Sequence, residues 1–104
     1  MPRITRKTGE EFVDPTLRTT AFDAVPERIY RCDATGGSFE VQLPPAAGLG
    51  GLDICLYAEH DSGNAVIAKP DGADTVTGVA SGVVNAREAA IFTSNNIDDW
   101  FKVS

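Results

Sequence analysis

The sequence predicts an all-β fold, a small antiparallel β-sandwich or barrel of about seven to eight short strands behind an extended N-terminal arm. Three observations support this prediction. From residue 28 onward, short apolar runs are separated by Gly, Pro, Asn and Asp, the residues that form turns. Several of these runs alternate apolar and polar residues, as a strand with one buried face does. The chain has 104 residues, 42% hydrophobic and 23% charged, which is the size and composition of one globular domain.

Residues 1–26 form the predicted arm, and residues 27–104 form the predicted single β domain. Neither the helical period of 3.6 nor the strand period of 2 persists through the first 26 residues. Prolines at positions 2, 15 and 26 interrupt this segment, and its apolar side chains are scattered. We therefore expect an extended segment that builds no core of its own.

The first strands of the domain are predicted from alternation and from the residues that end them. Residues 28–33 end at a turn over residues 34–37, where a Gly-Gly pair supplies backbone with positive φ. In residues 39–43 the odd-numbered positions are apolar and the even-numbered positions are polar. Prolines at 44 and 45 end this strand, because neither has an N–H to donate.

Residues 52–59 and 65–69 are predicted to pair as a hairpin, because the turn-forming stretch 60–64 separates them. The remaining predicted strands are short and occupy residues 75–77, 82–85, 88–94 and 100–103. Only residues 85–92, which include three alanines and a glutamate, offer a helix as the alternative, and their length is marginal for one.

The net charge of −6 is unevenly distributed along the chain. Residues 1–31 carry six basic and five acidic side chains, whereas residues 32–104 carry three basic and ten acidic ones. An acidic body disfavours nucleic acid as a partner, since binding phosphates needs clustered Lys and Arg. The basic start lacks the apolar stretch of a signal peptide, and no apolar run is long enough to span a bilayer. The sequence therefore predicts neither a nucleic-acid partner nor a membrane partner.

The cysteines and the single histidine are the first candidates for chemistry. Cys32 and Cys55 lie in strand-like runs, and we expect reduced, buried thiols, with a disulfide left open if the two strands pair. His60 stands beside Asp61 and Ser62, but adjacent residues rarely converge into a catalytic triad. We therefore expect a solvated histidine in a turn.

The acidic turns and the terminal aromatic pair are the remaining candidates. The acidic turns at residues 71–74 and 98–99 lack the spacing of a calcium-binding EF-hand loop, so turn formation explains them better. Trp100 and Phe101 would form a sugar-stacking platform if exposed, but burial is expected, because a small β domain needs large side chains in its core. The sequence predicts no catalytic residue, no metal site and no cofactor, and we do not expect an enzyme.

The order of these residues resembles a module found in bacteriophage head-decoration, head-fibre and tail-fibre proteins. The similar stretches are Val41-Gln42-Leu43-Pro44, Gly51-Leu52-Asp53-Ile54, Asn64-Ala65-Val66, residues 70–78 and Trp100-Phe101-Lys102-Val103. Residues 95–99 stand where the family often has an Asp-Gly step, so the last turn is longer here. The resemblance implies an antiparallel β module that assembles as a homotrimer on a virion.

On this basis we expect a bacteriophage capsid decoration (cement) protein. Such a protein would be made in the host cytoplasm, bind the major capsid protein on the virion surface as a homotrimer and stabilise the coat lattice. The length of 104 residues favours this role over a long fibre, since no shaft repeats are present. The alternative is a head-fibre or tail-fibre tip module that binds host surface glycan.

The residues expected to contact the capsid lie in the arm, where basic and apolar side chains share an irregular segment. They are Arg3, Ile4, Arg6, Lys7 and Phe12. Such a segment cannot fold alone, so it either stays disordered or becomes ordered on a partner surface. Its basic side chains would suit an acidic coat surface.

Overall fold

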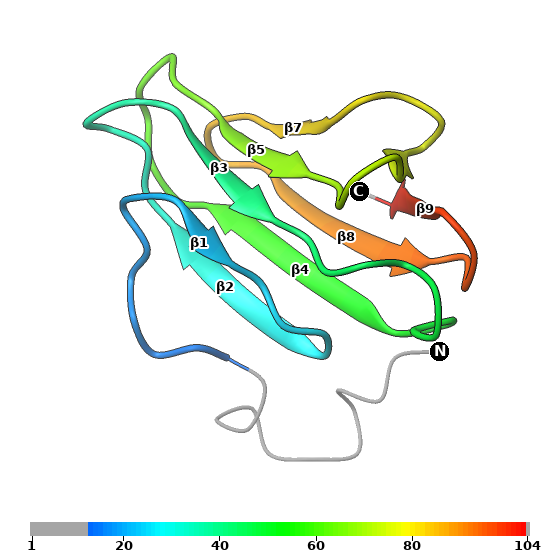
Figure 1. Cartoon of the computed structure of the whole chain (residues 1–104). Helices are drawn as coiled ribbons and strands as arrows, with labels where there is room; N and C mark the ends of the chain where they lie inside the picture. Colours follow the sequence, from blue (N-terminus) through cyan, green and yellow to red (C-terminus); the bar gives the residue numbers. More distant parts are fainter. Residues whose placement is uncertain (1–12, 104) are drawn as a thin grey trace.

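The structure is a computed structural model that describes residues 13–103, and residues 1–12 and 104 lie outside its described part. The described residues contain nine strands and no helix. The strands are β1 (Phe22–Asp23), β2 (Arg28–Cys32), β3 (Phe39–Gln42), β4 (Asp53–Ala58), β5 (Val66–Lys69), β6 (Thr75–Val76), β7 (Gly82–Val84), β8 (Ala89–Ser94) and β9 (Asp99–Val103). They form two layers (Figure 1), one with the order β1-β3-β5-β7 and one with the order β2-β4-β8-β9-β6. The all-β prediction is confirmed, and the fold is a small β-sandwich.

The predicted strand positions agree closely with the structure. The predicted strands at 28–33, 39–43 and 88–94 each match an observed strand to within one residue at either end. Residues 89–94 form strand β8, so a helix over 85–92 does not occur. Alternation and turn residues are local signals, and they locate strands well for that reason.

The predicted hairpin between residues 52–59 and 65–69 is wrong, because its two strands lie in different sheets. β4 pairs with β2 and β8, whereas β5 pairs with β3 and β7. The connection between them crosses from one layer to the other. A turn-forming sequence reverses the chain in either case, so it does not distinguish a hairpin from a crossing between layers.

The chain changes sheet at every step from β1 to β8, and this explains why the sheets are mixed. Because the chain alternates between the sheets, a strand often pairs with the next but one. β1 with β3, β3 with β5 and β2 with β4 pair in parallel, whereas β5 and β7 pair antiparallel. Four of the seven strand pairings in the described residues are parallel. The expected antiparallel arrangement therefore holds only for β4 with β8, β5 with β7 and β8 with β9.

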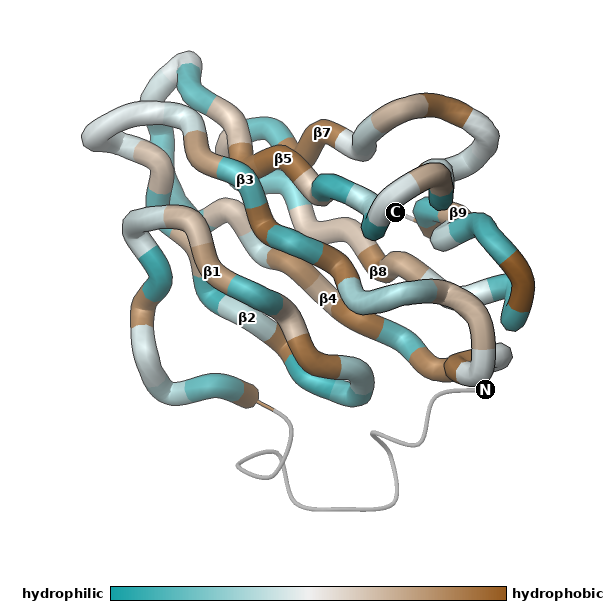
Figure 2. Tube along the Cα trace, viewed as in Figure 1, coloured by the Kyte–Doolittle hydropathy of each residue, from teal (hydrophilic) through white to brown (hydrophobic). Residues whose placement is uncertain are grey.

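The core lies between the two sheets and follows the alternation of the strands. Phe39 and Val41 on β3, and Leu43 just after it, are buried, and the hydropathy alternates along this strand in Figure 2. The largest fully buried side chains include Trp100 on β9 and Tyr30 on β2. Burial of these side chains is the main stabilising contribution in a domain of this size.

The described part of the predicted arm, residues 13–26, is extended and lies against the β domain. Val13 and Arg18 form isolated parallel bridges to β2, and β1 pairs with β3. Arg18 also lies over the Phe22 ring, 4.7 Å from its centroid. The packing is therefore continuous across residue 26, and residues 13–103 form one packed unit.

Candidate functional site

Five apolar side chains form a row across the outer face of the five-stranded sheet. The register pairs Val13 with Ile29, Ile29 with Cys55, Cys55 with Ile91, and Ile91 with Val103. Residues paired across strands point to the same face of a sheet. The two neighbours of Cys55 on β4 are fully buried between the sheets, so the row points outward. We call these five residues the apolar rung.

Three large apolar side chains on this face are exposed. Ile91 and Val103 are 39% and 50% exposed, and Phe101, which lies beside the rung on β9, is 41% exposed. Phe101 pairs with Thr93, two residues from Ile91 on β8. A single exposed apolar side chain is common, but a continuous row over several strands is typical of a surface that binds another molecule.

Two ion pairs lie on one long side of the apolar rung, farther along β2, β4 and β8. Arg31 donates hydrogen bonds of 2.8 and 3.0 Å to the Glu59 carboxylate. Arg87 donates hydrogen bonds of the same two lengths to Asp61. These hydrogen bonds lower the pKa of Glu59 and the pKa of Asp61, because they favour the charged carboxylate. The two charges of each pair cancel, so the residues beside the apolar row are polar but carry no net charge. Protein interfaces likewise have an apolar centre and a polar rim.

Asp53 and Thr93 lie on the other long side of the rung, and they are cross-strand partners. The Thr93 hydroxyl donates a 2.6 Å hydrogen bond to the Asp53 carboxylate. This carboxylate therefore has a partner within its own sheet, and covering the rung would not leave it without one.

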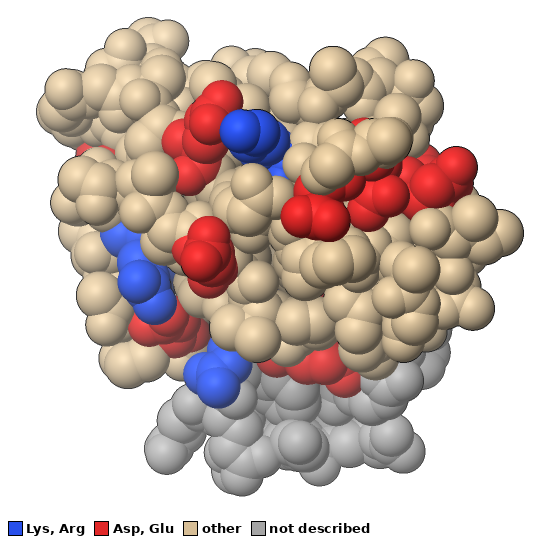
Figure 3. Space-filling view, viewed as in Figure 1, with Lys and Arg blue, Asp and Glu red and all other residues tan. Residues whose placement is uncertain are grey.

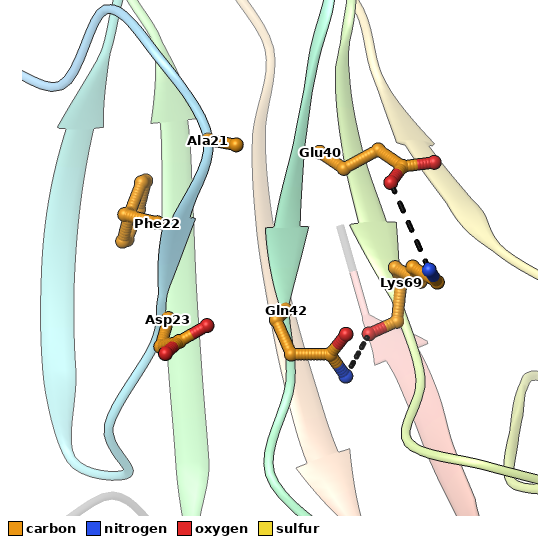
Figure 4. Close-up of a pocket in the computed structure, with 6 residues that line it drawn as sticks. All are labelled: Ala21, Phe22, Asp23, Glu40, Gln42 and Lys69. Atoms are coloured by element: carbon orange, nitrogen blue, oxygen red, sulfur yellow. Dashed lines mark hydrogen bonds and ion pairs between the residues drawn. The ribbon is translucent and has the colours of Figure 1, made fainter.

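The outer face of the four-stranded sheet is more polar and carries a shallow depression of about 350 Å3 (Figure 4). The residues that line it are Ala21, Phe22, Asp23, Glu40, Gln42 and Lys69. Lys69 Nζ lies 4.0 Å from a Glu40 carboxylate oxygen, and the Gln42 amide donates a 3.2 Å hydrogen bond to the Lys69 carbonyl. Acidic side chains are spread over the face seen in Figure 3, with basic side chains at a few separate places. The two broad faces of the sandwich therefore suit different surroundings.

His60 is buried, so the prediction of a solvated turn histidine is wrong. His60 is only 3% exposed and lies between two loops. The Ala34 N–H donates to Nδ1 at 3.2 Å, so the ring hydrogen is on Nε2, which donates to the Asn64 carbonyl at 2.9 Å. Asn64 in turn donates from its side chain to the Ala34 carbonyl at 2.9 Å. This histidine joins two loops, and both of its ring nitrogens are used in doing so.

Trp100 is buried as predicted, but its neighbour is not. Trp100 has no exposed surface, and its Nε1–H donates a 3.0 Å hydrogen bond to the Pro44 carbonyl. Phe101 points to the opposite side of β9 and contributes to the exposed face beside the rung. Trp100 therefore offers no surface for stacking on a sugar.

The acidic side chains of the two turns accept hydrogen bonds within the fold. Asp74 accepts a hydrogen bond from the Ala46 N–H at 3.0 Å, and Asp99 accepts one from the Thr75 hydroxyl at 2.6 Å. Among residues 13–103, no three His, Cys, Asp or Glu side chains gather as metal ligands. The same residues include no helix with the length and apolar character needed to cross a bilayer.

The two cysteines are unpaired, as expected, although their strands are neighbours. Only Cys32 is buried as predicted, whereas Cys55 is partly exposed. Cys32 lies opposite Ala58 and points into the core, whereas Cys55 lies opposite Ile29 and points outward. Burial raises the pKa of the Cys32 thiol to about 12 and also raises the pKa of Cys55. Their side chains leave opposite faces of the sheet, so no disulfide can form within this fold.

The residues predicted to contact a capsid lie outside the described residues. They are Arg3, Ile4, Arg6, Lys7 and Phe12. The amino-acid sequence alone does not identify the apolar rung, although alternation places Cys55 and Tyr57 on the wetter side of their strand. A row across strands becomes visible only when the register is known.

Comparison with known proteins adds no relative. No known protein-family profile matches the chain, and no curated protein matches it.

Proposed function

We propose that this chain is a bacteriophage capsid decoration protein. It assembles as a homotrimer, binds the major capsid protein on the virion surface and stabilises the coat lattice. The apolar rung is the observation that carries the proposal, since it gives the sandwich one face suited to assembly. The order of motifs along residues 39–103 supports the phage assignment. The fold shares its all-β character with the module that those motifs resemble, but four of the seven strand pairings in residues 13–103 are parallel, whereas the resemblance implies an antiparallel module.

Decoration requires many modest contacts rather than a catalytic site. A coat lattice repeats the same junctions over its whole surface, so a small domain that buries surface at each junction stabilises the lattice as a whole. In the described residues, the polar groups that first suggested chemistry, His60, Asp74 and Asp99, all hold backbone or side-chain partners within the fold.

Co-sedimentation with purified heads that lack this chain tests the proposal. We expect saturable binding at a fixed ratio of chain to coat subunit, and a higher temperature of head disruption once the chain is bound. Heads that already carry the full complement are the control and should bind none. Absence of binding to the heads of the virus that encodes the chain would contradict the proposal.

Separate variants test the role proposed for the arm. Replacing Arg3, Arg6 and Lys7 by Gln should weaken head binding and reduce its dependence on salt, because contacts made by charged groups are screened by ions. Replacing Glu10 and Glu11 by Gln in the same segment is the matched control and should not weaken binding. Equal binding by both variants would exclude the basic arm as a capsid contact.

The glycan-binding alternative loses the larger ring of its aromatic platform, because Trp100 is buried and only Phe101 is exposed. A specific hit on a glycan array, combined with failure to bind heads, would favour a fibre-tip role over decoration.

A further inference from the structure

We infer that the apolar rung is the contact between copies of this chain, with three outer faces of the five-stranded sheet packed around a common three-fold axis. The number of copies in this inference rests on the proposed function, whereas the surface at which they meet rests on the structure. Ile29, Cys55, Ile91 and Val103 lie in one register row on four adjacent strands. A flat sheet whose central row is apolar can meet two others around an axis and remove this row from water.

Exposure favours this face over the other broad face. Three of the eight large apolar side chains that are exposed among residues 13–103 lie together on this face, namely Ile91, Phe101 and Val103. On the other sheet the outer face includes the Glu40 and Lys69 side chains, which are 57% and 55% exposed. Burying that face would remove these charged groups from water. The charged side chains beside the rung, Arg31, Glu59 and Asp53, already have hydrogen-bonding partners within their own face, so covering it leaves none of them without a partner.

Local charge balance permits an identical copy as the occupant at this face. Residues 32–104 carry three basic and ten acidic side chains, so two copies repel each other over most of their surfaces. The ion pairs Arg31–Glu59 and Arg87–Asp61 cancel their charges at the border of the rung. Contact between like-charged copies is least opposed where local charges are balanced, and the rung lies beside such a border.

The size of the face is sufficient for a stable contact. The domain measures 34 × 33 × 20 Å, so its two broad faces are the largest flat surfaces it has. A standard protein interface buries about 800 Å2 on each partner, which a face of this size can supply. Cys55 is the middle residue of the rung, so three copies packed in this way would bring three partly exposed thiols toward the axis.

Light scattering on the full chain tests the inference. One chain is 11.0 kDa, so three chains give three times that mass, about 33 kDa. The variant Ile91→Lys places an ammonium group in the middle of each contact, and we expect it to have the mass of one chain. Val83→Lys is the matched control, because Val83 is 43% exposed on β7 of the other sheet, and it should keep the mass of three chains.

Circular dichroism and cooperative unfolding decide whether Ile91→Lys is folded. Should that variant not fold, Ile91→Thr keeps a β-branched side chain suited to a strand. We expect at least a tenfold rise in the concentration at which Ile91→Thr dissociates.

Several outcomes would overturn the inference. A folded Ile91→Lys variant that keeps the mass of three chains would do so, as would equal dissociation of both lysine variants. A wild-type mass of two chains would exclude the three-fold arrangement. A wild-type chain that is monomeric, but becomes trimeric when residues 1–12 are deleted, would show that the chain's own start covers the rung.

The proposed function fails by a different result. If the wild type forms trimers through the rung but does not bind heads, the inference stands and decoration is wrong. If it binds heads and Ile91→Lys remains a trimer, decoration stands and the inference is wrong.

Discussion

Replacing Trp100 by Phe tests whether β9 is held in the core as the structure describes. The side chain is fully buried, and its Nε1–H donates to the Pro44 carbonyl at 3.0 Å. Phe keeps an aromatic ring but has no N–H donor, and it is smaller than Trp. The substitution therefore leaves a partly buried carbonyl without this partner and opens a small cavity.

The expected loss of stability is the sum of two contributions. A buried acceptor that loses its donor costs about 1–3 kcal/mol. The cavity left by a large-to-smaller change of this size adds about 1–2 kcal/mol. We expect a total near 3 kcal/mol, and one kcal/mol shifts Tm by about 4–8 °C in a domain of this size. The melting temperature of Trp100→Phe should therefore fall by roughly 12–24 °C.

Thermal unfolding followed by circular dichroism measures this shift. Fluorescence is unsuitable, because Trp100 is the only tryptophan of the chain. Ile97→Val is the control, since Ile97 is 69% exposed in the turn before β9 and the change should cost less than about 1 kcal/mol. Protein concentration must be the same throughout, because self-association makes Tm depend on it. A fall of less than 4 °C for Trp100→Phe, or one equal to that of the control, would refute the described packing of β9.

Three further changes test other parts of the fold. Gly82→Ala places a Cβ 3.0 Å from the Phe92 ring, and overpacking should lower the free energy of unfolding in urea by about 1–3 kcal/mol. His60→Leu leaves one buried N–H and one carbonyl without their partner, which should cost about 2–4 kcal/mol in the same assay. Asp14→Asn should make Tm fall less steeply as the pH is lowered. In the wild type, the hydrogen bond from Arg18 lowers the pKa of Asp14 from its ordinary value of 3.8. The resulting stabilisation is complete above about pH 4 and is lost as the pH falls through the folded-state pKa.

Each of these changes has a control. A Cβ on Gly36 meets no atom within 4 Å, so Gly36→Ala should be nearly neutral. His60→Gln keeps one acceptor and one donor and should lose less stability than His60→Leu. A Gly82→Ala variant as stable as Gly36→Ala would contradict the close packing, and equal losses for the two His60 variants would show that the ring nitrogens do not act as described. An unchanged pH profile for Asp14→Asn would exclude its ion pair as a source of acid sensitivity.

The strands could be predicted from the sequence because the signals that define them are local. In residues 39–43, alternation gives both the strand and its buried side, and the prolines at 44 and 45 give its end. In residues 88–94, a short run with Ile91 and Phe92 favours a strand over a helix, and β8 occupies it. Period and turn chemistry are sufficient for predictions of this kind.

The pairing of strands could not be predicted in the same way. β4 and β5 both alternate, and both bury one side, so either could belong to either sheet. The structure joins the loops on both sides of the crossing through His60, which accepts from the Ala34 N–H and donates to the Asn64 carbonyl. Nothing in residues 60–64 taken alone indicates that their histidine is buried, because its partners become apparent only when the two layers are assembled.

The candidate surface was invisible in the sequence for the same reason. Cys55, Ile91 and Val103 lie far apart along the chain, and Cys55 and Ile91 stand between apolar neighbours, so the local pattern does not mark them as one outward row. Only the pairing of β4, β8 and β9 makes them a continuous row. The motif order that resembles phage modules is a property of the sequence, whereas the surface that would join such modules is a property of the register.

The position of the apolar rung also limits where a capsid contact can lie. If three copies bury the rung, the outer face with Glu40 and Lys69 and the connecting loops remain free. Val13 pairs with Ile29 at the edge of the rung, so the chain enters the described domain beside the boundary between copies. An arm that starts there can reach a neighbouring molecule without crossing the core of the contact. Loss of the basic arm residues should therefore reduce head binding and leave the mass of the assembly unchanged. Ile91→Lys should instead reduce that mass from three chains to one. Since three arms held together bind a lattice more tightly than one, Ile91→Lys should also weaken head binding.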